Sequence, residues 1–499
     1  MSSRPIQNPE NIAACTHTAV DMVLDTAYQN ISAAQWAELF SFARKSKLEG
    51  FIADIFTGKH INLSEDRPAL HSALRNLSKS PLMLDGEDVM PAIASVWRRM
   101  EALCNKWVGV TDLIHIGIGG SDFGPRLAID ALAHVPGIES RGMRIHFLAN
   151  IDTAELARIL DRAQPNSTRI IIVSKSFTTL ETMMNAKAVV NWLKDNDCTK
   201  GQIANSLFAV TANVSTAKEF GIEEDNIFPF WDWVGGRYSV WSAVGLPIAL
   251  QYGFKTFEQF LAGAHAIDLH FKNAPLEQNL PIIMALALLH QQETLSIKAY
   301  AAIPYADALD SFPKWLQQLD MESNGKSVDR HGKLVKHSSP VVFGSAGSNA
   351  QHSYFQLLHQ GSDVVPIDFI AVRKPMSDRP EALAHHRILL SNCLAQAQAL
   401  AHGKKANNPN DVYPGNRPSN LLLLPELNAF YLGALLALYE NRAASLGALW
   451  NINSFDQPGV EFGKVLAKPI EKALLDASHI VANDNIDAVT AARINLLNT

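Results

Sequence analysis

Two loops rich in glycine, serine and threonine are the segments of this chain best suited to hold an anion. The first lies in Leu113 to Pro125 (LIHIGIGGSDFGP) and the second in Arg169 to Thr182 (RIIIVSKSFTTLET). Each follows a short, β-branched apolar run, which is typical of a parallel strand covered on both faces. Each also opens a helical pattern, and the amide groups at a helix start carry a partial positive charge. The two segments therefore predict a pocket for a phosphate group.

The side chains of these loops add donors to the backbone amides. Lys175 would bring a full positive charge, and hydroxyl groups could donate to phosphate oxygens. The hydroxyl-bearing residues are Ser121, Ser174, Ser176, Thr178 and Thr179. Either loop alone could be an ordinary tight connection between a strand and a helix. The presence of two such loops, one with a lysine, favours phosphate binding.

The amino-acid sequence of the first loop excludes two nucleotide-binding motifs. A dinucleotide fingerprint that starts at Gly117 needs a third glycine at position 122, which is Asp122. A nucleotide P-loop over Gly119 to Gly124 needs a lysine next, and the chain has Pro125 there. We therefore expect a phosphate ligand that is not a nucleotide cofactor.

A candidate general base lies in the segment Ser311 to Gly325 (SFPKWLQQLDMESNG), which has a helical pattern and a glycine at its end. Gln318 and Glu322 are four residues apart, so both project to the same side of a helix and could contact one ligand. A carboxylate at the edge of an apolar surface suits the removal of a carbon-bound proton. A solvated helix glutamate is the alternative that spacing alone leaves open.

Two further segments offer a histidine and an arginine. Val341 to Gly361 repeats the order strand, Gly/Ser loop and helix, and places His352 in the first turn, where the positive helix end favours a neutral ring able to accept a proton. A histidine that caps or packs beneath the loop is the alternative. Arg237 follows two glycines in an aromatic setting (FPFWDWVGGRYSVWSA) and could stabilise an oxyanion or form a structural ion pair. In FDQPGVEFGK, Gln457 and Lys464 lie two turns apart, roughly on one helix face.

The composition is that of a large globular enzyme. A chain of 499 residues predicts two or three domains, and 47% hydrophobic with 18% charged residues excludes a disordered or fibrous protein. A net charge of −6 provides no basic field for nucleic acid or an anionic membrane. The four cysteines lack the spacing of a zinc site or a disulfide framework, and the first residues lack the apolar core of a signal peptide. We expect a cytoplasmic protein.

The order of patterns along the chain predicts an α/β fold with two mostly parallel sheets flanked by helices. Residues 1–108 form a mostly helical region with no strong strand. A first α/β domain covers 109–285, a second covers 286–450, and 451–499 form a C-terminal helical arm. The predicted strands are around His115 and at Ile145 to Leu148, Ile170 to Val173, Leu207 to Thr211, Ala299 to Pro304, Val341 to Gly344 and Val364 to Ala371. Leu421 to Tyr439 is interpreted as a loop that leads into a buried helix, because Pro425 and Glu426 interrupt a membrane span. Ligands of parallel sheets bind beyond the carboxyl ends of the strands, so the loops named above should face one crevice.

Two long stretches, VGGRYSVWSA and GALWNINSFDQPGVEFGK, closely resemble the signature motifs of the phosphoglucose isomerase family. GIGGSDFGP, SKSFTTLET, QLDMESNGK and GSNAQHSYFQLLHQG resemble further active-site segments of that family, in the same order, over roughly residues 105 to 470. The resemblance implies two sugar-isomerase domains, a homodimer with active sites at the subunit interface, and no metal or organic cofactor.

The resemblance also implies a role for each matching residue. Glu322 would move a proton between C1 and C2 of the sugar, Arg237 would stabilise the enediolate, and His352 from the partner subunit would act with Lys464 in ring opening. Gln318 and Gln457 would contact substrate hydroxyls or order the site. The residues implied to hold the sugar phosphate are Gly120, Ser121, Ser174, Lys175, Ser176 and Thr179.

The expected reaction is the reversible isomerisation of glucose 6-phosphate and fructose 6-phosphate through a cis-enediol, as in glycolysis and gluconeogenesis. Two alternatives stay open. An isomerase for mannose 6-phosphate or an amino-sugar phosphate would use the same parts. A regulatory phosphosugar sensor would need the loops but would not require Glu322, His352 and Lys464 together.

Overall fold

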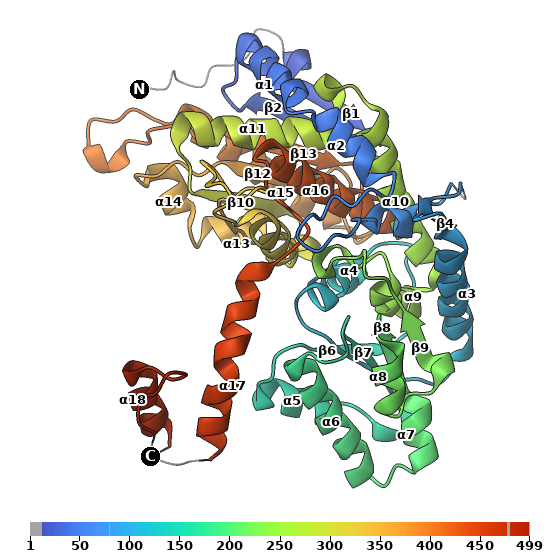
Figure 1. The fold of residues 1–499 in the computed structure, drawn as a ribbon. Helices are drawn as coiled ribbons and strands as arrows, with labels where there is room; N and C mark the ends of the chain where they lie inside the picture. The colour runs from blue at the N-terminus through green and yellow to red at the C-terminus, as the bar shows by residue number, and fades with distance from the viewer. Residues whose placement is uncertain (1–11, 79, 477–479, 499) are drawn as a thin grey trace. The chain divides into compact units, whose positions relative to one another are not determined.

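The computed structural model describes residues 12–78, 80–476 and 480–498. The chain divides into two compact units, Met1–Ser454 and Phe455–Thr499, and each is described by itself. Two large sheets and a short antiparallel pair, β3 (Met83–Leu84) with β4 (Glu87–Asp88), form the larger unit together with their helices (Figure 1). The expected α/β class is therefore confirmed, and the domain boundaries drawn within the sequence stay a prediction.

The first sheet has five parallel strands in the order β6-β5-β7-β8-β9. They are β5 (Asp112–Ile116), β6 (Arg144–Leu148), β7 (Thr168–Val173), β8 (Leu207–Thr211) and β9 (Ile227–Pro229). All residues of β5 and β8 are buried, as short apolar strands between helical layers should be. Helices α4 (Phe123–Leu132), α5 (Thr153–Leu160), α6 (Leu180–Asp195), α7 (Lys200–Ser206) and α8 (Val214–Glu219) connect them. The four predicted strands of this region are confirmed, and β9 is an additional one.

The second sheet has six strands in the order β1-β2-β13-β12-β10-β11. Its parallel part is formed by β10 (Ala299–Tyr305), β11 (Val341–Phe343), β12 (Ile367–Val372) and β13 (Ser419–Leu424). The antiparallel strands β1 (Thr16–Ala19) and β2 (Met22–Tyr28) extend it, and β2 pairs with β13. Strands β10, β11 and β12 match the predicted positions.

Two sequence expectations about this sheet are wrong. Residues 1–108 were expected to lack a strong strand, yet β2 alternates buried and half-buried residues along its length and lies inside the sheet. Leu421 to Leu424 were expected to belong to a loop, yet they form most of β13. In β2 the apolar alternation is short and contains Asp25, and in β13 the leucines continue toward a long apolar helix, so neither pattern indicates a strand locally.

Long helices cover the sheets and fill the centre of the larger unit. α10 (Phe254–Asn273), α11 (Leu280–Leu295) and α16 (Ala429–Leu449) pack against one another, and α16 is buried along most of its length. The N-terminal region contributes α1 (Ala33–Lys45), α2 (Leu48–Ile55) and α3 (Met90–Lys106), as its helical pattern predicts. Within the described residues, no helix has the length and apolarity needed to cross a membrane.

A buried ionic cluster joins these helices to the segment that follows Arg237. The Arg75 guanidinium donates to Asp268 of α10 through Nε (2.5 Å) and Nη2 (2.7 Å) and also pairs with Glu440 of α16. The indole of Trp241 donates to the Glu440 carboxylate at 2.9 Å. Burial raises the pKa of Glu440 to about 7 against the opposing effect of Arg75. Arg75 thus holds Glu440, and Glu440 in turn fixes Trp241, four positions after Arg237.

Candidate active site

The first glycine-rich loop follows β5 and forms a turn of 3-10 helix, Gly119–Ser121. The His115 Nε2 lies 2.7 Å from the carbonyl oxygen of Ser121, and burial lowers the pKa of His115 to about 4. The ring is therefore neutral, and its Nε2–H donates to the loop. Gly120 lies so close to the segment before Arg237 that a Cβ there would be 2.1 Å from the carbonyl carbon of Gly236. Because Gly120 has no side chain, the first loop can pack directly against that segment.

The second loop follows β7 and leads into α6, with Thr179 at its N-cap. The Ser174 hydroxyl is buried and lies 3.0 Å from the Thr179 hydroxyl, and the hydroxyls of Ser176 and Thr178 are 2.7 Å apart. Ser176 and Thr178 are exposed. Four hydroxyl groups thus lie in two adjacent pairs before the start of a helix, where backbone N–H groups favour an anion.

Lys175 also connects this loop to the segment that carries Arg237. Its ammonium donates to the carbonyl oxygens of Asp232 (2.8 Å) and Val234 (3.2 Å). Burial lowers the pKa of Lys175. Because an ammonium has three N–H groups, two can hold the loop that precedes Gly235 while one is directed elsewhere.

Both loops lie at the switch point of the first sheet. β5 is flanked by β6 on one side and β7 on the other, and the strand order reverses there. This is the crevice in which open parallel sheets bind ligands. β5 and β7 are directly paired and parallel, so their two loops leave the same edge of the sheet, as expected. That the other named loops face the same crevice stays a prediction.

Arg237 is buried, with 3% exposure, and each of its three guanidinium nitrogens has a defined direction. Nη1 donates to the Glu322 carboxylate at 3.2 Å, Nε donates to the Ser323 hydroxyl at 2.7 Å, and Nη2 donates to the carbonyl of Ser454 at 2.6 Å. A permanent positive charge thus lies beside the candidate general base.

Glu322 ends a π-helical segment, Gln318–Glu322, that continues α12 (Phe312–Gln317). The Gln318 side chain donates to the second oxygen of Glu322 at 2.8 Å, so the predicted neighbourhood of the two residues is confirmed. The side chain of Glu322 keeps 23% of its surface exposed, enough for a ligand to reach it. π-helical turns within helices occur frequently at functional sites.

The first loop touches this segment as well. Gly119 has φ +62°, and a Cβ there would lie 3.0 Å from the Gln318 amide nitrogen. Gly119, Gln318, Glu322 and Arg237 therefore form one continuous cluster, which we call the Glu322 cluster. Its elements come from the first loop, the segment after β9 and the π-helix.

A buried ion pair anchors the π-helix to α16. Asp320 accepts a hydrogen bond from Arg442 of α16, and both side chains are almost fully buried. The Arg442 guanidinium lies over the rings of Tyr439 (4.7 Å) and Tyr300 (5.0 Å). Burial raises the pKa of Asp320 although Arg442 acts in the opposite direction. The backbone that carries Glu322 is thus tied to the most buried helix of the fold.

The structure corrects the local setting of His352. This residue is exposed and follows α13 (Gly347–Gln351), at the C-cap, before α14 (Phe355–Gln360) begins. The expectation that it lies in the first turn of a helix is wrong, because the helix starts five residues earlier and is short. The helix-end argument for His352 as a proton acceptor therefore no longer applies, and its proposed role in ring opening rests on the family resemblance.

Gln457 and Lys464 belong to the C-terminal unit. Lys464 lies in α17 (Glu461–Leu475), is exposed, and donates to Glu461 at 2.8 Å. Gln457 precedes a 3-10 turn, Pro458–Val460. This unit has a small core of its own, where α17 meets α18 (Ala488–Leu497). The roles of both residues in the site stay predictions.

Comparison with known proteins supplies the family. A family model described as phosphoglucose isomerase matches residues 25–494. The chain belongs to the phosphoglucose isomerase family. It is 45% identical over 507 residues to a glucose-6-phosphate isomerase from Cupriavidus metallidurans, covering 97% of this chain and 92% of that one. It is 40% identical to the enzyme of the same name from Hahella chejuensis, covering 98% and 91% of the two chains.

A solved structure agrees with this assignment. The crystal structure of a glucose-6-phosphate isomerase from Chlamydia trachomatis has a TM-score of 0.90 and 30% sequence identity, and the match covers 99% of this chain and 96% of that chain. The resemblance that the sequence motifs indicated is therefore confirmed over nearly the whole phosphoglucose isomerase fold.

The structure adds residues that the sequence motifs did not single out. Ser323 and the carbonyl of Ser454 hold the guanidinium of Arg237, and the carbonyls of Asp232 and Val234 hold Lys175. The contacts of Lys175 with two backbone carbonyls could not be predicted from sequence, because every residue has a backbone carbonyl. Ser323 directly follows Glu322 and is a small polar residue in a helix, which was the one available signal.

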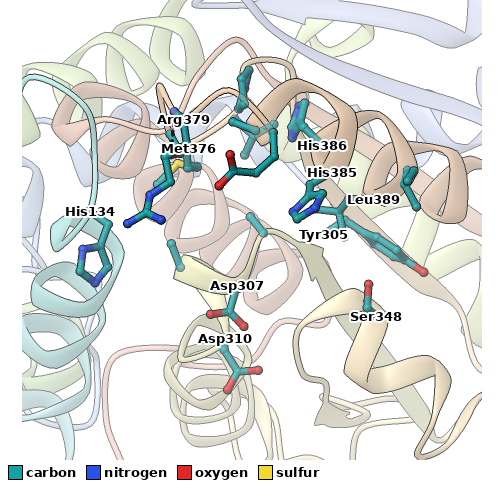
Figure 2. A pocket seen from close by; sticks show the side chains of 18 of the residues that line it. His134, Tyr305, Asp307, Asp310, Ser348, Met376, Arg379, His385, His386 and Leu389 are labelled. Carbon is teal, nitrogen blue, oxygen red and sulfur yellow. Dashed lines mark hydrogen bonds between the residues drawn. The ribbon is translucent and has the colours of Figure 1, made fainter.

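A separate cavity of about 950 Å³ lies at the switch point of the second sheet, beyond the ends of β10 and β12 (Figure 2). His134, Arg379 and His385 face the hollow together with Asp307. None of the residues of the Glu322 cluster lines it. Its walls combine apolar side chains with one arginine, three histidines and four carboxylates, so acidic groups outnumber the permanent positive charge.

Proposed function

We propose that this member of the phosphoglucose isomerase family catalyses the reversible isomerisation of glucose 6-phosphate and fructose 6-phosphate, a step of glycolysis and gluconeogenesis. The names of the relatives support this activity. The observation that carries the proposal is the buried Arg237, whose Nη1 lies 3.2 Å from the Glu322 carboxylate at the sheet edge that bears both loops. A charge pair of this kind suits a proton transfer that creates an oxyanion next to the base.

The two loops would hold the phosphate group of the sugar. The amides near Gly120 and Ser121 and the hydroxyls of Ser174, Ser176 and Thr179 supply donors without a large positive field. Lys175 would add its remaining N–H. Binding energy from this remote group can then orient C1 and C2 against Glu322.

The proton transfer needs only one carboxylate. In the open-chain aldose, Glu322 would take the proton from C2, the electrons of that C–H bond would form the C1=C2 double bond, and O1 would become an oxyanion. Glu322 would then return a proton to C1, while the hydroxyl proton of O2 passes to O1 and C2 becomes the ketone carbon. Because the oxidation of C2 is balanced by the reduction of C1 within the same sugar, the reaction requires no redox cofactor.

Arg237 would stabilise the enediolate. Its charge is permanent, and its guanidinium is already held in place before any substrate arrives, so little reorganisation accompanies the reaction. A single donor to a developing oxyanion contributes about 3 kcal/mol to the stability of the transition state. Gln318, which donates to Glu322, would keep the carboxylate oriented between C1 and C2.

Ring opening would involve His352 and Lys464, with Gln457 in contact with substrate hydroxyls. We propose a homodimer in which His352 comes from the partner subunit, and the exposure of His352 supports this arrangement. A cytoplasmic location fits the absence of a disulfide bond among the four cysteines, all of which lie within the described residues.

Proton NMR of fructose 6-phosphate in deuterated water tests the activity directly. The purified protein should place deuterium on C1 of fructose 6-phosphate and on C2 of the glucose 6-phosphate formed, because the proton that Glu322 carries during the lifetime of the enediol exchanges with solvent. Binding without exchange would show a phosphosugar sensor instead. Formation of mannose 6-phosphate as the main product would assign a different isomerase.

Mixing two inactive variants tests the shared site. His352→Ala and Glu322→Gln chains, unfolded together and refolded, should regain about a quarter of the wild-type activity, because half of the random dimers would contain one intact site of two. Each variant refolded alone is the control. No recovery in a mixture that sizes as a dimer would show that both residues act within one chain.

A further inference from the structure

Ser323 is a buried hydroxyl at the edge of the Glu322 cluster. The residue has no exposed surface and follows Glu322 directly in the chain. Its Oγ accepts a hydrogen bond from Arg237 Nε at 2.7 Å and lies 3.0 Å from the Tyr238 hydroxyl. With no exposed surface, Ser323 is not placed to touch a sugar, so its influence on a reaction would pass through Arg237.

The geometry of the guanidinium gives this contact its importance. The group is planar and its N–H bonds lie in that plane, so directional hydrogen bonds at two nitrogens fix the plane and with it the direction of the third nitrogen. Ser323 holds Nε, and the carbonyl of Ser454 holds Nη2. The remaining nitrogen, Nη1, is then directed at Glu322. Without the Ser323 acceptor, the plane could rotate about the contact with Ser454.

The chain position of Ser323 links this acceptor to the base itself. Glu322 and Ser323 are consecutive, and the π-helix that carries them is anchored through Asp320 to Arg442. Glu322 and Ser323, the acceptor that orients Arg237, therefore belong to one anchored backbone segment. Tyr238 keeps its proton, because burial raises its pKa to about 12, so it is a neutral partner for the hydroxyl.

We propose that Ser323 is a positioning residue that orients the Arg237 guanidinium toward the reacting atoms at Glu322. The proposal rests on the proposed isomerase function for its consequence in turnover, and on the buried hydrogen bond for its structural part. It assigns to Ser323 an effect on the chemical step and none on capture of the phosphate group.

Steady-state kinetics of Ser323→Ala test the effect on turnover. We expect kcat to fall about 10- to 100-fold, as for a misplaced catalytic group, while KM for fructose 6-phosphate stays within about threefold of wild type. Ser323→Cys fills nearly the same space with a poor acceptor and should show the same split. An unchanged kcat in both variants, or an equal rise in KM, would overturn the proposal.

Tyr238→Phe is the matched control. It removes a hydroxyl from the same buried cluster and leaves the contact between Arg237 Nε and Ser323 in place. If Ser323 acted only by stabilising the fold, both variants would lower the melting temperature and neither would change kcat. We expect a lowered kcat only in the Ser323 variants.

A double-mutant cycle with Arg237→Lys separates the two roles further. Lysine lacks the Nε donor, so Ser323→Ala in that background should reduce kcat by less than about twofold. The same 10- to 100-fold loss in both backgrounds would show that Ser323 acts independently of Arg237.

Crystal structures of wild type and Ser323→Ala test the placement without turnover. We expect the guanidinium of Arg237 to rotate or shift away from Glu322 in the variant. A wild-type protein that fails to isomerise would refute the proposed function, whereas an Arg237 that stays in place in Ser323→Ala would refute the positioning role alone.

Discussion

Replacing Glu322 with glutamine should abolish isomerisation and leave sugar-phosphate binding in place. Glutamine has nearly the same size, and its amide oxygen can still accept from Arg237 as Oε1 of the carboxylate now does, while its NH2 group replaces the oxygen that Gln318 contacts. The amide cannot take a proton from carbon. Loss of a general base costs up to about 10⁴-fold, so we expect a fall in kcat of at least about 10³-fold.

The measurement pairs deuterium exchange with binding. Glu322→Gln should show no exchange at C1 of fructose 6-phosphate by NMR, while isothermal titration calorimetry gives an affinity within about tenfold of wild type, because the phosphate loops are unchanged. Glu224→Gln, an exposed glutamate paired with Lys218, is the control and should behave as wild type. Exchange that continues in Glu322→Gln within tenfold of wild type would mean that another group is the base.

The parts of the site that sequence could predict are those encoded locally. The strands before both loops are short, apolar and bounded by glycine or serine, so β5 and β7 and their loops were predictable from a few consecutive residues. The neighbourhood of Gln318 and Glu322 followed from a spacing of four. Parallel pairing of β5 and β7 then placed the two loops at one edge, as the general rule for such sheets requires.

The contacts that sequence could not predict join distant segments. Arg237 and Glu322 are 85 positions apart, and neither residue type identifies the other as its partner. Strand β2 meets β13 at the far end of the chain, so its short alternating pattern acquires meaning only in the assembled sheet. The setting of His352 was misjudged because the Gly/Ser-rich segment before it looks like a loop, whereas Gly347–Gln351 already form a helix.

Replacing Gly120 with alanine should disrupt the site by separating the first loop from the Arg237 segment. The new Cβ would lie 2.1 Å from both the carbonyl carbon and oxygen of Gly236 and 2.5 Å from the amide nitrogen of Arg237. All three are backbone atoms, so the clash cannot be relieved by rotating a side chain, and one of the two segments must move. A displacement of about 1 Å in a catalytic group can cost about 100-fold, and we expect at least that loss in kcat/KM.

Gly236→Ala provides a control on the other side of the same contact. A Cβ at Gly236 meets no atom within 4 Å, so this variant changes the same pair of segments without forcing them apart. We expect Gly236→Ala to keep kcat/KM within about threefold of wild type and Gly120→Ala to lose about 100-fold or more, with a lower melting temperature from overpacking. Equal activity in the two variants would show that the approach of the loop to Arg237 is unimportant for turnover. Equal loss would instead mean that the segment around Arg237 tolerates no added side chain, so its own conformation, and not its contact with the loop, limits the reaction.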